Sequence, residues 1–118
     1  MTMKLKKSND ETYVISIYGD LDLYNSNQLK LLVTNMQKRG ITKIVIDFEN
    51  SDYIDSCGIG VLIYIFSMAK KLGLHVYICN LTKTVRKVIE LTKLTQFFDI
   101  KSSVNEAVDV LDGKVHTC

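Results

Sequence analysis

The chain has 118 residues, 47% of them hydrophobic and 24% charged, and a formal net charge of only +2. Its length suits one domain with one hydrophobic core, and its composition excludes disordered and fibrous proteins. A charge this small, carried by lysines scattered along the chain, argues against nucleic-acid binding. We therefore expect one domain over residues 1–118, with a core over about 4–111 and a flexible tail over 112–118.

Three cysteines, Cys57, Cys79 and Cys118, have spacings that match no zinc-ligand pattern. An odd number of widely spaced cysteines is typical of free thiols in a reducing cytosol. The basic N-terminus has no apolar segment behind it, as a signal peptide would, and no apolar run approaches the roughly 20 residues that span a bilayer. We expect a cytoplasmic protein that binds no metal, no membrane and no nucleic acid directly.

The first predicted elements are two strands, over residues 3–7 and 12–19. The second is rich in Tyr, Val and Ile, which favour strands. Asn9 and Asp10 lie between the two segments and favour a turn. This pattern predicts an N-terminal β-hairpin.

A helix is predicted within residues 19–40, where the hydrophobic period changes. Its apolar side chains recur at the spacing of one helical face: Leu29, Leu32, Val33 and Met36. Asn25 or Ser26 is expected to cap its start. Gly40 is expected to end it in the left-handed conformation.

A buried strand is predicted over residues 41–48, because this β-branched run lacks polar alternation. The loop over 49–56 follows. The segment over 58–72 is too long for a strand and has basic residues near its end, so it predicts a helix that Gly73 ends. A second buried strand is predicted over 74–80.

The remaining segments predict an amphipathic helix over 81–94, a short strand over 96–100 and a closing helix over 104–111. The order ββαβαβαβα indicates an α/β fold with one mixed sheet of about four to five strands, about four helices and helical crossovers. In such sheets, functional loops gather at the carboxyl ends of parallel strands. We therefore expect the loops over 19–25 and 52–60 to lie side by side.

The second of these loops contains an acid, a hydroxyl and a thiol in succession, followed by glycines. Taken alone, Ser56 is interpreted first as the N-cap of a helix that begins near Gly58. Gly58 and Gly60 leave the first helical turn without bulky side chains, so its backbone N–H groups are open to an anion. The loop contains no P-loop, no dinucleotide fingerprint and no GxSxG elbow.

Two catalytic alternatives remain open at these loops. Cys57 suits a nucleophilic thiol only if His75 or His116 serves as its base, and a small buried residue is the favoured interpretation. The loops also contain carboxylates: Asp20, Asp22 and Asp55. These could act in acid–base chemistry or bind a metal, but a solvated acidic rim is favoured.

Three segments carry a family resemblance: GDLDLYNSNQL, KIVIDFENSDYIDSCGIGVLI and LHVYICNLTKTVRKVIELTKLTQFFDI. In order and spacing they resemble the STAS domain of bacterial anti-sigma factor antagonists. The resemblance covers roughly residues 4–111 and implies a STAS fold. Its most specific part is the pattern D-F-x-x-x-x-Y-I-D-S-x-G-I-G-V-L over 47–62. The family usually has Ser or Ala where this chain has Cys57, which is a conservative departure in size.

The resemblance implies a function in partner switching. The unphosphorylated protein is expected to bind an anti-sigma factor that is also a serine kinase, and so to free a sigma factor for transcription. Phosphorylation of Ser56 by that kinase abolishes binding, and a separate serine phosphatase restores it. The chain itself is then not an enzyme and needs no cofactor. The residues expected to bind the partner are Asp22, Tyr24, Asn25, Asp55, Ser56, Cys57, Gly58, Ile59 and Gly60.

Two other functions remain open. One is a STAS scaffold or regulatory subunit that is never phosphorylated, in a signalling or transport complex. The other is a small-ligand or enzymatic role, with a nucleotide phosphate bound weakly at the Ser56 helix terminus or Cys57 as nucleophile. The helix predicted over 58–72 has apolar residues on more than one face. We favour burial of these residues under neighbouring helices over an exposed surface that contacts a partner. The basic residues Lys83, Arg86 and Lys87 are interpreted as a solvated helix face, and a contact to an acidic partner stays open without any feature of the sequence that favours it.

Overall fold

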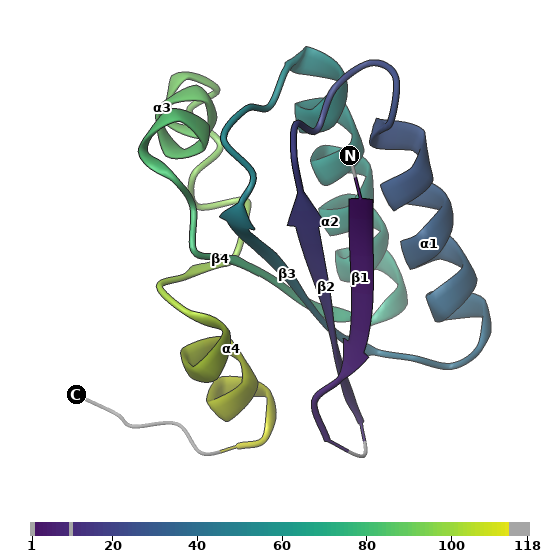
Figure 1. Ribbon diagram of the computed structural model, residues 1–118. Coiled ribbons are helices and arrows are strands. Elements are labelled where there is room, and N and C mark those ends of the chain that lie inside the picture. The colour runs from purple at the N-terminus through teal and green to yellow at the C-terminus, as the bar shows by residue number, and fades with distance from the viewer. Residues whose placement is uncertain (1, 10, 114–118) are drawn as a thin grey trace.

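The computed structural model describes residues 2–9 and 11–113, and within these ranges five strands and four helices follow one another in the predicted order (Figure 1). The strands are β1 Thr2–Lys7, β2 Thr12–Tyr18, β3 Lys43–Asn50, β4 His75–Cys79 and β5 Ile100–Lys101. The helices are α1 Ser26–Lys38, α2 Ser56–Leu72, α3 Lys83–Leu91 and α4 Val104–Leu111. The predicted α/β fold class is confirmed.

The strands form one sheet in the order β1-β2-β3-β4-β5. β1 pairs antiparallel with β2, as the predicted hairpin requires, and the other neighbours are parallel. Parallel neighbours need crossover connections, which α1, α2 and α3 supply. The carboxyl ends of β2 and β3 therefore lie at the same end of the molecule, the top of Figure 1.

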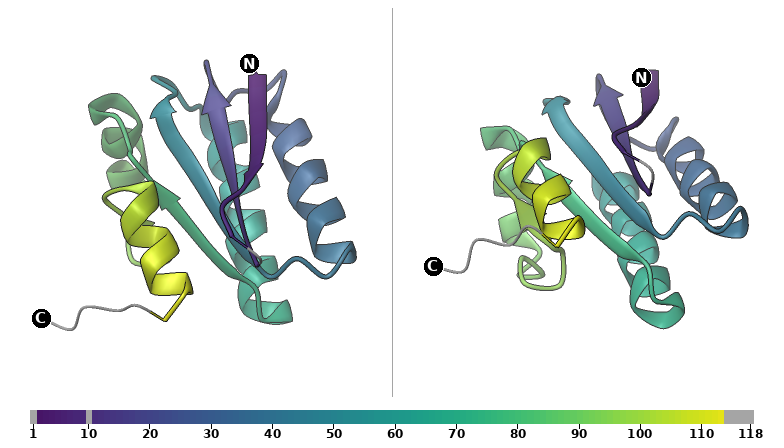
Figure 2. Two further views of the ribbon diagram at one scale, coloured as in Figure 1. Left: turned by 60° about the horizontal axis from the view of Figure 1, so that its bottom comes forward. Right: turned by 90° about the horizontal axis from the view of Figure 1, so that it is seen from below.

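The hydrophobic core occupies both faces of the sheet (Figure 2). On one face, three helices contribute buried side chains: Leu29 and Val33 of α1, Leu62 and Phe66 of α2, and Val85 and Ile89 of α3. On the other face, α4 packs Ala107 and Leu111 against Val14, Val45 and Cys79. The predicted helical faces are confirmed, and α4 alone covers the second side of the sheet within the described ranges.

The central strand β3 is buried from Ile44 to Phe48, which accounts for its unbroken apolar pattern. Asp47 is the polar exception in this stretch. Its Oδ1 accepts hydrogen bonds from Asn80 Nδ2 at 3.0 Å and from the Glu49 N–H at 3.0 Å. The buried carboxylate is thereby satisfied, and it ties the end of β3 to the end of β4.

The predicted strand over 96–100 is wrong for most of its length, because β5 contains only Ile100 and Lys101. The N–H groups of Phe97 and Phe98 both donate to the Leu94 carbonyl, at 2.9 and 3.1 Å, and so close a turn. The Phe98 ring lies 5.4 Å from the ring of Phe66 on α2, edge to face. Aromatic packing on a helix, not strand pairing, therefore places this segment.

The chain end bears on the predicted tail over 112–118. Residues 114–118, including His116 and Cys118, lie outside the described residues, as does Asp10 of the predicted hairpin turn. Asp112 follows α4, and its Oδ1 accepts a hydrogen bond from Asn9 Nδ2 at 2.7 Å. The start of the predicted tail is therefore in contact with the hairpin.

Candidate functional site

The loop from β2 to α1 and the loop from β3 to α2 lie side by side, as predicted. An isolated parallel bridge joins Leu21 to Ile54, and both residues are buried. The Leu21 N–H donates to the Tyr53 carbonyl at 2.9 Å, and the Asp55 N–H donates to the Leu21 carbonyl at 3.2 Å. The two loops therefore form one unit at the carboxyl ends of β2 and β3.

Asp55 is the N-cap of α2, which corrects the prediction that Ser56 has this role. Its Oδ1 accepts hydrogen bonds from the N–H groups of Cys57 at 2.9 Å and Gly58 at 3.0 Å. Its Oδ2 accepts one from the Leu23 N–H, across the neighbouring loop, at 3.0 Å. The backbone bonds, first that from Gly58, hold the pKa of Asp55 below its ordinary value of 3.8, although burial opposes them. One carboxylate thus starts the helix and joins both loops.

Ser56 is the first residue of α2, two residues before the predicted helix start, and its side chain is exposed. Because Asp55 supplies the cap, the Ser56 hydroxyl is not required for it. The expected anion site at the first turn is corrected as well, since the N–H groups of Cys57 and Gly58 already bond to Asp55. The accessible chemistry at this end of α2 is therefore the Ser56 hydroxyl.

The two glycines of the loop have different roles. A Cβ added to Gly58 would lie 2.6 Å from Ile54 Cγ1 and 2.7 Å from the Leu21 carbonyl oxygen, so only glycine fits where the loops meet. A Cβ at Gly60 would meet nothing within 4 Å. Gly60 lies one turn after Ser56 on the same helical face, and it leaves the surface beside the hydroxyl bare.

The residues predicted to bind a partner divide by exposure. Gly58 and Ile59 are buried, which corrects the expectation that they contact a partner directly. The exposed residues are Tyr24, Ser56 and Gly60. The half-buried residues are Asp22, Asn25, Asp55 and Cys57. The structure therefore brings seven of the nine to the surface of the two loops.

The β2–α1 loop is held in shape by its own polar side chains. Asn25 Oδ1 accepts a hydrogen bond from the Asp22 N–H at 2.9 Å, and Asn25 Nδ2 donates to the Asp20 carbonyl at 2.7 Å. Asp22 Oδ1 accepts from the Tyr24 N–H at 2.9 Å. Asn25 occupies the N-cap position of α1, as predicted, but its side chain closes the loop and makes no capping bond.

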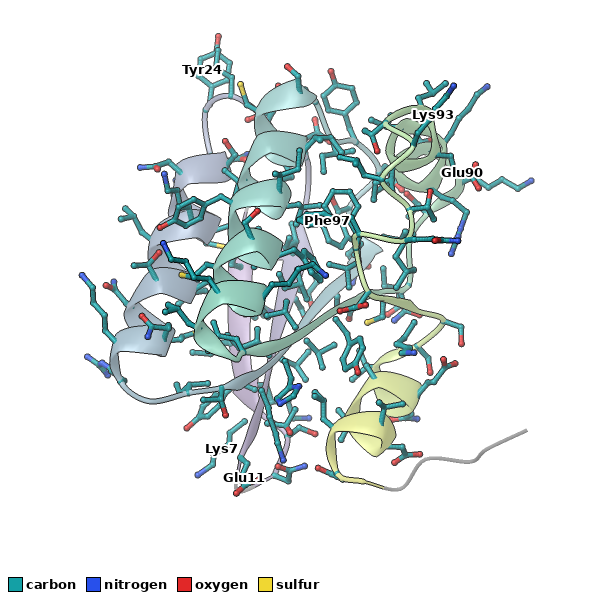
Figure 3. All side chains as sticks on the ribbon, turned by 180° about the vertical axis from the view of Figure 1, so that it is seen from behind. Lys7, Glu11, Tyr24, Glu90, Lys93 and Phe97 are labelled. Carbon is teal, nitrogen blue, oxygen red and sulfur yellow. The ribbon has the colours of Figure 1, made fainter. Side chains whose placement is uncertain are left out.

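Three large side chains project from these loops into solvent. Leu23 is 62% exposed, Tyr24 89% and Tyr53 47%, and we call these residues the loop patch. Figure 3 shows Tyr24 pointing away from the body of the molecule. Leu23 and Tyr53 were not among the residues predicted to bind a partner, although apolar residues between the acids of a loop are a signal in the sequence. Exposed aromatic and aliphatic side chains near an exposed serine suit docking of another protein.

A catalytic pair of Cys57 with His75 is not supported, and His116 lies outside the described residues. Cys57 is the second residue of α2 and His75 lies beyond the other end of the helix, and 17 helical residues span about 25 Å. Burial, followed by the nearby Asp47 and Glu49, raises the pKa of the Cys79 thiol to about 12. Within residues 2–9 and 11–113, no group of three or more His, Cys, Asp or Glu side chains could hold a metal ion. In the same ranges, no helix has the length and apolarity needed to cross a bilayer.

Two other predicted surfaces keep their expected character. Most apolar residues of α2 are buried or half-buried. Tyr64 and Leu72 are exposed, and the Lys30 ammonium lies 4.2 Å from the centroid of the Tyr64 ring. The basic residues of α3 are all exposed: Lys83, Arg86 and Lys87.

A family model described as the STAS domain matches residues 3–107 of this chain. Among curated proteins, the chain is similar to the anti-sigma-B factor antagonist of Staphylococcus aureus. The two are 26% identical over 103 residues, which are 87% of this chain and 92% of that protein.

Solved structures share the fold. The anti-sigma factor antagonist SpoIIAA in its unphosphorylated form aligns with a TM-score of 0.75 and 24% identity, over 95% of this chain and 99% of that one. The phosphorylated form of the same Bacillus protein aligns with a TM-score of 0.73 and 24% identity, over 93% and 99%. An anti-sigma factor antagonist from Mycobacterium paratuberculosis aligns with a TM-score of 0.83 and 19% identity, over 94% and 93%.

Proposed function

The chain belongs to the STAS-domain family, and from this premise we propose that it is an anti-sigma factor antagonist controlled by phosphorylation of Ser56. The unphosphorylated form binds an anti-sigma factor that is also a serine kinase, and so frees a sigma factor in the cytoplasm. Phosphorylation switches binding off, and a serine phosphatase switches it on again. The chain has no catalytic residue in this function and needs no cofactor.

One observation carries the proposal: an exposed serine hydroxyl begins α2 while the neighbouring Asp55 supplies the helix cap. Phosphorylation of a serine that capped its own helix would change the hydrogen bonds that start that helix. Ser56 does not have that role, so a kinase can modify it without removing a bond that the fold uses. The names of the similar proteins support the same role, since they are anti-sigma factor antagonists and one was solved in a phosphorylated form.

The switch follows from the charge that phosphorylation adds. The kinase transfers a phosphoryl group from ATP to Ser56 Oγ, and the hydroxyl proton leaves to a base on the kinase. The product carries about −1.5 to −2 charges. Because the N–H groups of Cys57 and Gly58 are bonded to Asp55, they do not neutralise this phosphate, which remains exposed toward an approaching partner.

Neighbouring acids strengthen the effect. Asp55 adjoins Ser56, and Asp22 lies on the loop that Asp55 contacts through the Leu23 N–H. A phosphate added to this rim makes the docking surface strongly anionic and requires more desolvation on binding. A hundredfold loss of affinity needs only about 2.7 kcal/mol, which repulsion and lost packing on the loop patch together can supply.

The experiment mixes the purified protein with anti-sigma kinases from the same genome, ATP and Mg²⁺, and records the intact mass. We expect one added phosphate on the wild type and none on Ser56→Ala. Ser67→Ala is the matched control, because Ser67 is also exposed on α2 and should leave phosphorylation unchanged. No phosphate from a kinase that binds the protein would contradict the switch and favour an unphosphorylated scaffold.

A further inference from the structure

Helix α3 begins with a cluster of positive charge that its local energetics disfavour. Lys83, Arg86 and Lys87 fall within its first five residues and are exposed, and its first turn contains no acid. The N-terminal end of a helix carries the positive pole of its dipole, so cations there are unfavourable. Lys83 is also spaced three and four residues from the other two, where like charges on a helix repel.

Glu90 lies four residues after Arg86 and three after Lys87, where it offsets part of their charge, but it forms no ion pair with either. The ion pair found in residues 2–9 and 11–113 joins Lys43 to Glu11, at the opposite end of the molecule from α3 (Figure 3). No carboxylate therefore lies within ion-pairing distance of Lys83, Arg86 or Lys87 in these ranges. Residues that break local rules without a structural gain are expected at functional surfaces.

The cluster lies beside the proposed site. Thr82, the N-cap of α3, donates a hydrogen bond from its hydroxyl to the Ser51 carbonyl at 3.1 Å, at the start of the loop that leads to Ser56. The side chains of Val85 and Ile89 are fully buried, which fixes the rotation of α3 and turns its cations outward. Figure 3 shows Glu90, in the last turn of α3, and Lys93, just after the helix, toward the same end of the molecule as Tyr24.

We propose that the cationic start of α3 binds an acidic surface of the same kinase that engages Ser56. The inference rests on the proposed function and adds a second contact to it. The β2–α1 and β3–α2 loops contain four acids: Asp20, Asp22, Asp52 and Asp55. A polyanion such as nucleic acid or an anionic membrane would meet these carboxylates, whereas a folded partner can place acidic groups against α3 alone and contact the loops through polar and apolar groups.

The test is the double variant Lys83→Glu/Lys87→Glu, compared with Lys38→Glu/Arg39→Glu. The control changes the net charge equally, on exposed residues at the far end of α1. Surface plasmon resonance follows the association of the kinase with the unphosphorylated wild type and with each unphosphorylated variant, at low and at moderate salt. We expect the α3 variant to bind at least about tenfold more weakly, mainly through a slower association rate that depends less on salt. The control should stay within about twofold.

Unfolding does not explain such a loss, because glutamates near the start of α3 complement the helix dipole and should raise the melting temperature. If the wild type binds no kinase and gains no phosphate, the proposed function fails. If it binds and is phosphorylated, but the α3 variant binds equally tightly, only this inference is overturned. Wild-type binding to duplex DNA or anionic vesicles that the α3 variant loses, with kinase binding unchanged, would also overturn it.

Discussion

Asp55 shows how a single carboxylate can organise the docking surface. It accepts bonds from the N–H groups of Leu23, Cys57 and Gly58, and so couples the start of α2 to the loop that carries the loop patch. The neighbouring Ser56 is left with an unconstrained hydroxyl. Because Asp55 and not Ser56 supplies the cap, the proposed phosphorylation of Ser56 would leave the bonds that start α2 intact.

The lowered pKa of Asp55 predicts a pH dependence of stability. Its main cause is the hydrogen bond from the Gly58 N–H. A carboxyl whose pKa is lower when folded contributes its full stability above its unfolded pKa, about 4, and loses that contribution as the pH falls through the folded value. We expect Asp55→Asn to be less stable than wild type at pH 7 by about 0.5–1 kcal/mol. Urea unfolding at several pH values should show this difference shrinking below about pH 4. A difference that stayed constant down to pH 2.5 would contradict the assignment.

The position of Ser56 at the start of a helix was predictable from the sequence, but the identity of its cap was not. Serine and aspartate are both favoured N-caps, so local preference does not separate Asp55 from Ser56. The choice depends on the approach of Leu21 to Ile54, which brings the Leu23 N–H within reach of the Asp55 carboxylate. The spacing of residues within either loop does not indicate such a contact between segments that are distant in the chain.

At the level of elements, α2 depends on a close approach that glycine alone permits. Gly58→Ala would place a methyl group 2.7 Å from the Leu21 carbonyl oxygen, whereas Gly60→Ala would place one in open space. We expect the first variant to lose about 1–3 kcal/mol of stability through overpacking. We expect the second to gain about 0.5–1 kcal/mol, because alanine favours a helix over glycine. Chemical denaturation measures both, and similar values for the two variants would contradict this reading of the loop contact.

The spacing of hydrophobic residues in the sequence predicted the elements whose buried side chains follow a regular pattern within the element itself. The unbroken apolar run of β3 and the one-sided pattern of α1 match the structure, and Gly40 and Gly73 both have positive φ just after their helices. The segment over 96–100 was mispredicted for a different reason. Its phenylalanines favour strands, but they are held by Phe66 on α2, a partner about thirty residues away that no local pattern reveals.

At the scale of the whole molecule, the sheet gathers the functional features at one end. Parallel pairing of β2 and β3 places both loops at the carboxyl ends of these strands, and the Thr82 contact adds α3 to the same end. The net charge of +2 does not indicate that, at this end of the molecule, the two loops are acidic and α3 is basic. Composition alone did not predict this division, because it arises only when the chain folds.

If phosphorylation of Ser56 switches docking off, calorimetric titration with the kinase partner should show the loss of affinity directly. The unphosphorylated protein and protein phosphorylated fully on Ser56 are titrated in parallel with kinase in the presence of ADP, which prevents further transfer. The account predicts a Kd at least about a hundredfold weaker for the phosphorylated form, a difference of about 2.7 kcal/mol. Equal affinity of the two forms would contradict it.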